Sequence, residues 1–398
     1  MKKNWKKVAV LGAAKTGISC ANYFSKKGAD VLLSEAKKKN DIQIKNLSKK
    51  VKLEFGGHSS RILSCDLIIP SPGVSGDIPI LLSAKKRDIE ILSDIDIFFL
   101  RSSYKMIIAI TGTNGKTTTT SMVGEALSDA GYKNIVCGNI GVPVCDFIEK
   151  SDAQTYVVME VSSYQLEYTK NFAPHIAAIL NITPDHLERH KTMENYAYIK
   201  SKIFANQKKN DFCILNKDDE LCFKLSRKCS SKIKFFSAKE SKKTLNLKIP
   251  GVHNRENALA SIEMLTFAGL SKKTILKSLS DFKGVEHRLE FVRKIGGVKY
   301  INDSKSTNVS STFVAIKSFS QPIILILGGR DKGSPYTSLI PLIKNNVKKI
   351  ISIGEAKKKI FTKLKDATDI ILLDNVEAAV KKAGEFAVVC YVVMLSDR

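Results

Sequence analysis

The chain has no long apolar run. Its 398 residues contain no segment of about 18 consecutive apolar residues, the length that a membrane-spanning helix needs. The longest candidate, residues 386–395, is better interpreted as a buried strand. The lysine-rich N-terminus leads into a strand at residues 8–11 and a glycine turn, unlike the apolar region of a signal peptide. We therefore expect a soluble, cytoplasmic protein without a membrane span.

Cysteine and histidine motifs are missing as well. The eight cysteines form no C-x-x-C pair, and their spacings match neither a zinc site nor a secreted disulfide framework. His186 and His190 are four residues apart, but Leu187 stands where the zinc-protease motif H-E-x-x-H requires glutamate. We expect reduced, mostly buried thiols and no zinc protease.

Negative charge is scarce. The chain has 39 acidic residues against 64 lysines and arginines, which gives a net charge of +25. This balance suggests a nucleic-acid-binding ATPase, but the sequence contains no recognised nucleic-acid module. The lysines are scattered along the chain, so we favour a solvated basic surface that attracts polyanionic nucleotides. No nucleic-acid partner is expected.

The strict phosphate-binding pattern G-x-x-x-x-G-K-[ST] is incomplete, because Ile110 occupies its first glycine position. A compact variant, T-G-T-N-G-K-T, stands between a predicted strand at 106–110 and a predicted helix at 117–130. Backbone N–H groups at such a helix start attract an anion. Lys116 would reach the β- and γ-phosphates of a nucleotide, and the Thr117 hydroxyl would bind Mg²⁺. The alternative is an ordinary strand-turn-helix junction.

Two predicted strands of the N-terminal part end in polar loops. The strand at 31–33 leads to Glu35, where an acidic residue suggests contact with a sugar or a base. The strand at 65–70 is followed by Ser71-Pro72-Gly73, and ligands of parallel sheets bind at such ends. The glycine pattern after the first strand is G-x-x-x-x-G, so a dinucleotide site is only weakly indicated.

Further polar groups follow the strands of the central part. Glu160 ends the predicted strand 155–159, where a carboxylate beside a phosphate loop suits a Mg²⁺ ligand. The strand 176–180 runs into N-I-T-P-D-H, which ends at His186. Lys200 lies in a predicted helix at 193–206, and by position alone it would be a solvated lysine.

Strands and helices alternate along the whole chain, which predicts an α/β fold of three domains. We expect a Rossmann-like N-terminal domain at 1–93 and a central P-loop ATPase-like domain with a mainly parallel sheet at 94–284. A Rossmann-like C-terminal domain at 285–398 completes the prediction.

The motifs T-G-T-N-G-K-T, E-V-S-S-Y-Q-L-E, N-I-T-P-D-H, G-x-H-N-x-x-N-A and H-R-L-E together resemble the Mur ligase family of ATP-dependent amide-bond ligases. Within it, G-A-A-K-T-G-I-S, S-P-G-V, I-N-D-S-K-S-T-N and L-G-G-R-D-K-G resemble the branch that adds D-glutamate to UDP-N-acetylmuramoyl-L-alanine in cytoplasmic peptidoglycan precursor synthesis. The resemblance implies that ATP converts the substrate carboxylate to an acyl phosphate, which the incoming amine attacks. We also expect a monomer.

The resemblance assigns roles to individual residues. It implies that Lys116, Glu160, His186 and Lys200 are catalytic, that Thr117 and Glu160 bind one Mg²⁺, and that His186 and a carbamylated Lys200 serve a second. It implies ATP contacts at Gly112, Thr113, Asn114, Gly115, Lys116, Thr117 and Thr118, with Asn257 on adenine, Arg288 on phosphate and Asp303 on ribose. It implies UDP-substrate contacts at Lys15, Thr16, Glu35, Ser71, Gly73 and Asn139, and D-glutamate contacts at Lys305, Thr307 and Lys332.

The end of the sequence departs from the family pattern. The family continues S-P-A-C-A-S, whereas here Ser396 is followed by Asp397-Arg398. We therefore expect a truncated C-terminal domain with an open strand edge and an uncovered apolar face. The alternative function is an ATP- and UDP-sugar-binding homologue that is inactive because this segment is missing.

Overall fold

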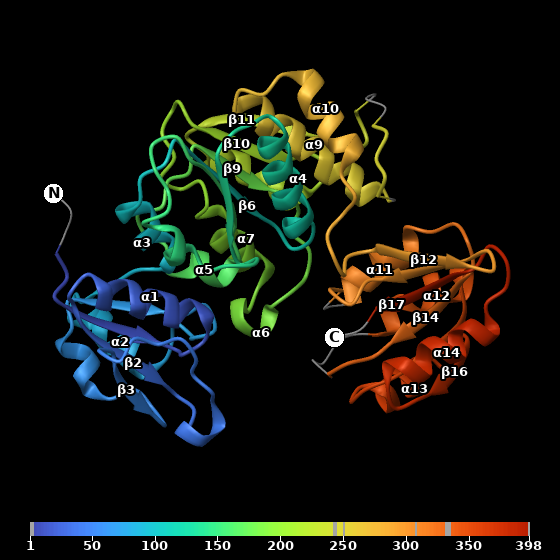
Figure 1. Cartoon of the computed structure of the whole chain (residues 1–398), viewed down its shortest axis with the longest axis horizontal. Helices are drawn as coiled ribbons and strands as arrows, with labels where there is room; N and C mark the ends of the chain where they lie inside the picture. The colour runs from blue at the N-terminus through green and yellow to red at the C-terminus, as the bar shows by residue number, and fades with distance from the viewer. Residues whose placement is uncertain (1–3, 242–244, 250, 307–308, 331–335, 397–398) are drawn as a thin grey trace. The chain divides into compact units, whose positions relative to one another are not determined.

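The computed structural model describes residues 4–241, 245–249, 251–306, 309–330 and 336–396 (Figure 1). The chain forms three sheets in two compact units, Met1–Lys243 with Glu256–Ser278, and Thr244–Arg255 with Leu279–Arg398. The first unit holds two of the sheets, so the predicted α/β fold with three sheet-forming parts is confirmed. No helix in the described ranges is long and apolar enough to cross a membrane.

The first sheet is parallel and has the order β3-β2-β1-β4-β5. Its strands are β1 (Lys7–Leu11), β2 (Asp30–Glu35), β3 (Lys52–Phe55), β4 (Leu67–Pro70) and β5 (Glu90–Ile91). The chain leaves β1 toward β2 on one side and reaches β4 on the other. In such sheets a ligand usually binds in a crevice at this reversal of strand order, here at the carboxyl ends of β1 and β4.

The second sheet is also parallel, with the order β11-β10-β9-β6-β8-β7. Its strands are β6 (Met106–Thr111), β7 (Asn134–Gly138), β8 (Tyr156–Glu160), β9 (Ile176–Ile179), β10 (Phe212–Asn216) and β11 (Lys232–Phe236). The β-branched strand β6 lies between β8 and β9 and is almost wholly buried, as its composition predicts. The loop that follows it therefore lies in the middle of the sheet edge.

Helices connect these strands. The first unit contains α1 (Lys15–Lys26), α2 (Pro79–Lys86), α3 (Asp94–Arg101), α4 (Lys116–Asp129), α5 (Ser163–Glu167), α6 (Leu187–His190), α7 (Met193–Ser201) and α8 (Glu220–Leu225), with α9 (Val252–Phe267) and α10 (Lys272–Asp281) each crossing the unit boundary. The second contains α11 (Val309–Lys317), α12 (Ile340–Asn346), α13 (Lys357–Leu364) and α14 (Val376–Phe386). Short 3₁₀ turns are η1 (Lys39–Asp41), η2 (Ser60–Ser64), η3 (Val144–Phe147), η4 (Ser226–Lys228) and η5 (Tyr336–Leu339).

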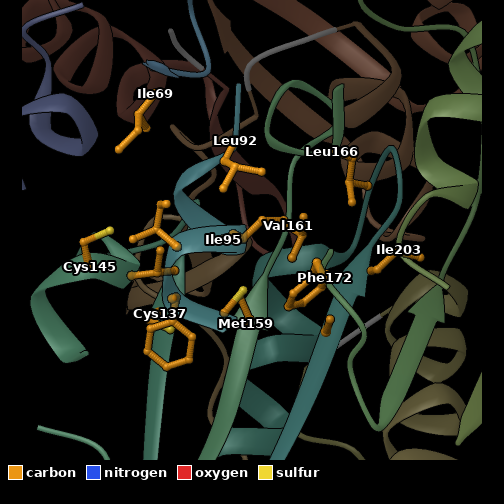
Figure 2. Packing of buried hydrophobic residues seen from close by; sticks show 14 of the residues in the cluster. Ile69, Leu92, Ile95, Cys137, Cys145, Met159, Val161, Leu166, Phe172 and Ile203 are labelled. Carbon is orange, nitrogen blue, oxygen red and sulfur yellow. The ribbon is translucent and has the colours of Figure 1, made fainter. Parts of the chain in front are cut away.

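One hydrophobic cluster joins the first two sheets. It includes Ile69 and Leu92 from the N-terminal part and Met159, Val161 and Phe172 from the central part, all at most 1% exposed. Figure 2 shows these side chains gathered with those of neighbouring elements. Because the core is continuous, residues 1–243 and 256–278 form a single compact unit, whereas residues 244–255 and 279–284 of the predicted central domain belong to the second unit.

Buried carboxylates reinforce this junction. Ser93 caps α3 in a capping box with Asp96, and Asp96 also accepts hydrogen bonds from the backbone N–H groups of Lys170, Asn171 and Phe172. Asp94 accepts a hydrogen bond of 2.9 Å from Gln165 Nε2. The start of α3 is thereby fixed to the segment that follows α5.

The third sheet is mixed, with the order β12-β13-β17-β14-β15-β16, in which only β12 and β13 run antiparallel. Its strands are β12 (Glu290–Ile295), β13 (Val298–Asn302), β14 (Ile323–Leu327), β15 (Val347–Ser352), β16 (Asp369–Leu372) and β17 (Val392–Ser396).

The expectation of an open edge at the last strand is wrong. β17 pairs with β13 on one side and β14 on the other, so it is an internal strand. Both of its faces are packed, since Val392 and Met394 join one hydrophobic cluster and Val393 joins another with Ala379 of α14. The predicted strand at 386–395 is also too long, because Phe386 ends α14 and the strand begins at Val392.

The buried Asp94 provides a test of how α3 is anchored. Burial raises the pKa of its carboxyl from 3.8 to about 6, so the folded state binds this proton more tightly than the unfolded chain. This group's stabilising contribution is complete below pH 3.8 and is lost as the pH rises through 6. Between pH 4.5 and 7.5 the wild type should lose about 2 kcal/mol that Asp94→Asn retains.

Urea unfolding across this pH range measures the difference. Asp129→Asn, at an exposed position at the end of α4, is the matched control and should follow the wild type. Parallel curves for wild type and Asp94→Asn would contradict the burial argument.

Candidate functional site

The loop between β6 and α4 has the geometry of an anion-binding turn. Gly115 occupies the N-cap of α4 with φ +84°, a conformation that strains any residue with a Cβ. A Cβ there would lie 2.3 Å from Asn257 Oδ1. Lys116 Nζ donates to the carbonyl oxygens of Gly112 (2.9 Å) and Thr113 (2.8 Å). The side chain of Lys116 therefore folds back and bonds to the backbone of the predicted phosphate loop.

The N-I-T-P-D-H segment supports this loop from the adjacent strand β9. Asn181 Oδ1 accepts from Asn114 N at 2.8 Å, and the Asn181 carbonyl accepts from Thr113 N at 2.9 Å. Thr183 N donates to Thr113 Oγ1 at 3.0 Å. Sequence reasoning missed this supporting role of Asn181; its only signal was an amide residue directly after a buried strand.

Glu160 lies beside the start of α4, as its position at the end of β8 predicts. Thr117 Oγ1 donates to Glu160 Oε2 at 2.8 Å, and Asn139 Nδ2 donates to Oε1 at 2.8 Å. The residue is 2% exposed. Thr117 and Glu160 are thus brought together, and Asn139, predicted to contact the UDP substrate, holds the same carboxylate.

The oxygen donors of Thr117 and Glu160 fit Mg²⁺, which is held by one or two carboxylates together with phosphate and water oxygens. Within the ranges that the structure describes, no group of three or more His, Cys, Asp or Glu residues could form a metal cage. This pair therefore suits an ion that arrives with a nucleotide.

The other two predicted catalytic residues occupy different surroundings. His186, at φ +54°, begins α6, its side chain is 41% exposed, and Nδ1 lies 3.0 Å from Tyr164 Oη. Lys200 is 1% exposed and donates to the Gly112 carbonyl at 2.9 Å. As an amine it is a hydrogen-bond donor and no Mg²⁺ ligand. The structure thus brings Lys200 to the loop and leaves His186 on the adjoining turn.

The environment of Lys200 lowers the pKa of its amine. Burial, helped by the neighbouring positive charge of Lys116, holds the pKa of the Lys200 amine well below its ordinary value, while Asp185 opposes the shift. The amine lies 4.5 Å from the centre of the Tyr196 ring. Lys200 is therefore far from the solvated lysine that its position alone would suggest.

His190 is a packing residue that sequence reasoning did not assign. It is 2% exposed, its Nε2 lies 2.9 Å from Ser163 Oγ, and its ring stacks on Tyr196 at 5.1 Å between centroids. Burial lowers its pKa to about 4, so it is neutral near pH 7. It supports the α6 turn that carries His186.

Five of the six predicted UDP-substrate residues lie at the first-sheet crevice, where β1, β2 and β4 end or in the segments that follow them, whereas Asn139 follows β7 of the second sheet. Ser71 Oγ donates to the Gly12 carbonyl at 3.0 Å, and Glu35 accepts from the N–H groups of Ala13 and Lys37 at 2.7 and 3.0 Å. These two side chains shape the glycine turn. The remaining predicted residues at this crevice are Lys15 and Gly73, which are exposed, and Thr16, which is half-buried.

A separate cluster forms in the second compact unit. Asp303 is fully buried, accepts from Leu289 N at 3.1 Å and is hydrogen-bonded by Ser306 Oγ. Burial raises the pKa of Asp303 to about 6. Arg288 Nε is buried without a hydrogen-bond partner in the described structure, and a guanidinium donor of this kind suits an anion.

Three further residues were predicted to contact D-glutamate. Lys305 is half-buried in the loop after β13. Thr307 and Lys332 lie outside the described residues.

Gly115 supplies a test of the loop. Alanine at this φ costs about 1–2 kcal/mol of strain, and its Cβ would also displace Asn257. We expect Gly115→Ala to weaken binding of a non-hydrolysable ATP analogue by at least about tenfold, measured by calorimetry.

Gly131→Ala is the matched control, because Gly131 follows α4 with φ +76° and a Cβ placed there would have no atom within 4 Å. It should bind the analogue normally. Equal losses in both variants would mean that backbone strain alone, rather than the loop's contact with Asn257, governs binding.

Comparisons with known proteins agree with this geometry. Residues 6–93 match the Mur ligase MurD-like N-terminal domain, residues 110–246 the Mur ligase middle domain, and residues 287–393 the Mur ligase glutamate ligase domain. The solved structure of the UDP-N-acetylmuramate-alanine ligase MurC from Thermotoga maritima has the same fold, with a TM-score of 0.62, 19% identity and coverage of 99% of this chain and 96% of that one. MurF from Acinetobacter baumannii gives a TM-score of 0.63 at 17% identity over 98% and 90% of the two chains.

Comparison of sequences gives relatives with higher identity to this chain than these two structures. The UDP-N-acetylmuramoylalanine–D-glutamate ligase of Clostridioides difficile is 40% identical over 98% of this chain and 93% of its own length. That of Koribacter versatilis is 40% identical over 98% and 92%. Such coverage disfavours the inactive alternative. With three domain families matched in order and relatives this similar, the chain belongs to the Mur ligase family.

Proposed function

We propose that this chain is an ATP-dependent ligase that joins D-glutamate to UDP-N-acetylmuramoyl-L-alanine in cytoplasmic peptidoglycan precursor synthesis. The observation that carries the proposal is the set Thr117–Glu160–Asn139 beside the phosphate loop and Lys116. The names of the 40% identical relatives support the substrate assignment.

The residues fit a reaction in two steps. The carboxylate of the L-alanyl group attacks the γ-phosphorus of ATP, releasing ADP and leaving an acyl phosphate. The amine of D-glutamate then attacks the acyl carbon, loses a proton, and phosphate leaves. Both steps build negative charge on phosphoryl and acyl oxygens, so positive groups are the catalysts needed.

Lys116 supplies such a group. Its ammonium rests on the Gly112 and Thr113 carbonyls, close enough to the loop to transfer its hydrogen bonds to a phosphate oxygen. Thr117 and Glu160 would hold Mg²⁺, whose charge would neutralise the phosphates. We assign Gly112, Thr113, Asn114, Gly115 and Thr118 to the same phosphate cradle.

The remaining contacts are proposed in the same way. Lys15, Thr16, Glu35, Ser71 and Gly73 would hold the UDP substrate at the first-sheet crevice, where Ser71 and Glu35 act by shaping the turn. Asn257 would contact adenine, Arg288 phosphate and Asp303 ribose. The unpaired Arg288 Nε supports the phosphate assignment. Lys305, Thr307 and Lys332 would serve D-glutamate, a dicarboxylate that suits two lysines.

We propose that Lys200 is carbamylated and, with His186, serves a second Mg²⁺. Only a neutral amine attacks CO₂, forming an N–C bond and losing a proton, and burial favours the neutral amine here. The product would place a carboxylate where the structure has an ammonium donor. A monomer is proposed as well.

Carbamylation can be observed directly. After equilibration with ¹³C-bicarbonate, the wild type should give a carbamate ¹³C resonance that is absent in Lys200→Ala. Lys202→Ala is the matched control, since Lys202 is two residues away, is less buried and also has a lowered pKa. A resonance that persists in Lys200→Ala, or none in the wild type, would exclude the modification.

The ligase activity has a direct assay. The chain incubated with ATP, Mg²⁺, UDP-N-acetylmuramoyl-L-alanine and D-glutamate should release phosphate and form the amide, and omitting any component should stop it. Lys116→Met should lower the rate by at least about 100-fold, because a positive group is lost from the transition state. Lys133→Met, at a surface lysine paired with Asp152, should remain active.

UDP-substrate affinity separates the alternatives. It should be nearly unchanged in Lys116→Met, because the crevice belongs to another sheet. Normal binding of both nucleotides by the wild type without amide formation would identify the inactive homologue instead.

A further inference from the structure

Arg189 is a half-buried cation in the α6 turn with no role in the reaction described above. It stands between His186 and His190, and its side chain is 15% exposed. Its Nε donates to Glu167 Oε2 at 3.0 Å, and Nη2 lies 2.9 Å from the same oxygen. Hydrogen bonds between charged partners in such surroundings are among the stronger ones in proteins.

The guanidinium also reaches the N-terminal part of the chain. Nη2 donates to the carbonyl oxygen of Val74 at 2.5 Å. Val74 belongs to the loop 71–76 after β4, which contains Ser71 and Gly73 of the proposed UDP-substrate crevice. Tyr168 Oη donates to the same Val74 carbonyl at 2.6 Å. One backbone oxygen is thus held by two side chains of the central part.

The fit around this contact is close. A Cβ on Gly76 would lie 2.7 Å from Glu167 Oε1, so the loop approaches the carboxylate as nearly as glycine allows. Tyr168 is 6% exposed, and its ring packs in a hydrophobic cluster with Ile68 and Leu81. The loop 71–76 is therefore fixed against the residues that follow α5.

The same arginine belongs to the turn that carries His186. The backbone N–H groups of Arg189 and His190 both donate to the His186 carbonyl at 3.0 Å. A displacement of Arg189 would consequently shift the backbone of His186, whose φ of +54° is already in the left-handed region. Arg189 thus lies between two sites that must cooperate if one substrate occupies both.

We propose that Arg189 is a positioning residue that sets the loop 71–76, and with it the UDP-substrate crevice, relative to the phosphoryl-transfer site. It acts through the Val74 carbonyl and Glu167 without touching the reacting atoms. The proposal rests on the ligase function proposed above. Lysine cannot replace it, because one ammonium cannot satisfy the carboxylate and the carbonyl in the planar geometry of the guanidinium.

The test compares Arg189→Met, Arg189→Lys and Tyr168→Phe with the wild type. Calorimetry with UDP-N-acetylmuramoyl-L-alanine gives a readout independent of turnover, and steady-state kinetics separates KM from kcat. We expect Arg189→Met to raise both Kd and KM for this substrate by about tenfold or more, because the variant leaves Glu167 and the Val74 carbonyl without their half-buried charged donor. KM for ATP should change less than about threefold, Arg189→Lys should recover little, and Tyr168→Phe should show a smaller shift in the same direction.

Lys202→Met controls for general loosening, since Lys202 Nζ donates to the Glu167 carbonyl but to no atom of the loop among the described contacts. Its UDP-substrate Kd should stay at the wild-type value. A lowered melting temperature in Arg189→Met with unchanged Kd would reduce Arg189 to a structural residue and overturn the proposal, as would equal changes in the KM values for both substrates. If Tyr168→Phe and the wild type bind alike while Arg189→Met fails to fold, the proposal also falls.

Failure of the ligase function gives a different pattern. A wild type that binds the UDP substrate but forms no amide would refute the function, and the Kd comparison would still decide the role of Arg189. A wild type that binds no UDP substrate would refute both.

Discussion

Two lysines share one acceptor in this structure, the carbonyl oxygen of Gly112. Lys116 and Lys200 each place Nζ 2.9 Å from it. Two ammonium groups at such a point repel one another, and the buried one loses its proton more readily. A bound phosphate would relieve that repulsion by drawing Lys116 away, and a carbamate on Lys200 would remove it altogether. Asn181 holds the backbone of the loop on which the lysines converge, and Thr183 holds the side chain of Thr113.

The continuous core between the first two sheets matters for a reaction between two large substrates. Because Ile69, Leu92, Met159 and Phe172 pack in one cluster, the proposed sugar-nucleotide crevice and the phosphate loop belong to one compact unit. Hydrogen bonds from Arg189 and Tyr168 to the Val74 carbonyl then connect the loop 71–76 to the central part. Hydrophobic burial thus sets the positions of the two sheets, and directional hydrogen bonds set the position of the loop 71–76.

The sequence allowed much of this to be predicted, since buried parallel strands are β-branched and polar residues follow their ends. Strand β6, the turn at Gly115 and the meeting of Thr117 with Glu160 depend on local pattern and on strands that lie side by side. The contacts that the sequence did not predict are made between residues far apart in the chain that the fold brings together. Nothing around Arg189 indicates that its guanidinium crosses to residue 74, and nothing in Glu35 or Ser71 indicates that their polar atoms are used within the turn. The internal position of β17 was also beyond reach, because strand order is set by packing between segments far apart in the sequence.

The place of β17 has a consequence for how the second unit is made. β13 and β14 are not neighbours in the finished sheet, since β17 inserts between them and pairs with both. Residues 298–327 leave the ribosome before residue 396 does. Strands β13 and β14 therefore remain without their shared neighbour β17, which is synthesised about 70 residues later. Until then the two halves of the sheet each present an unpaired edge. Closure of this unit is therefore a late, non-local event, and its exposed edges are where a nascent chain of this protein would need a chaperone's protection.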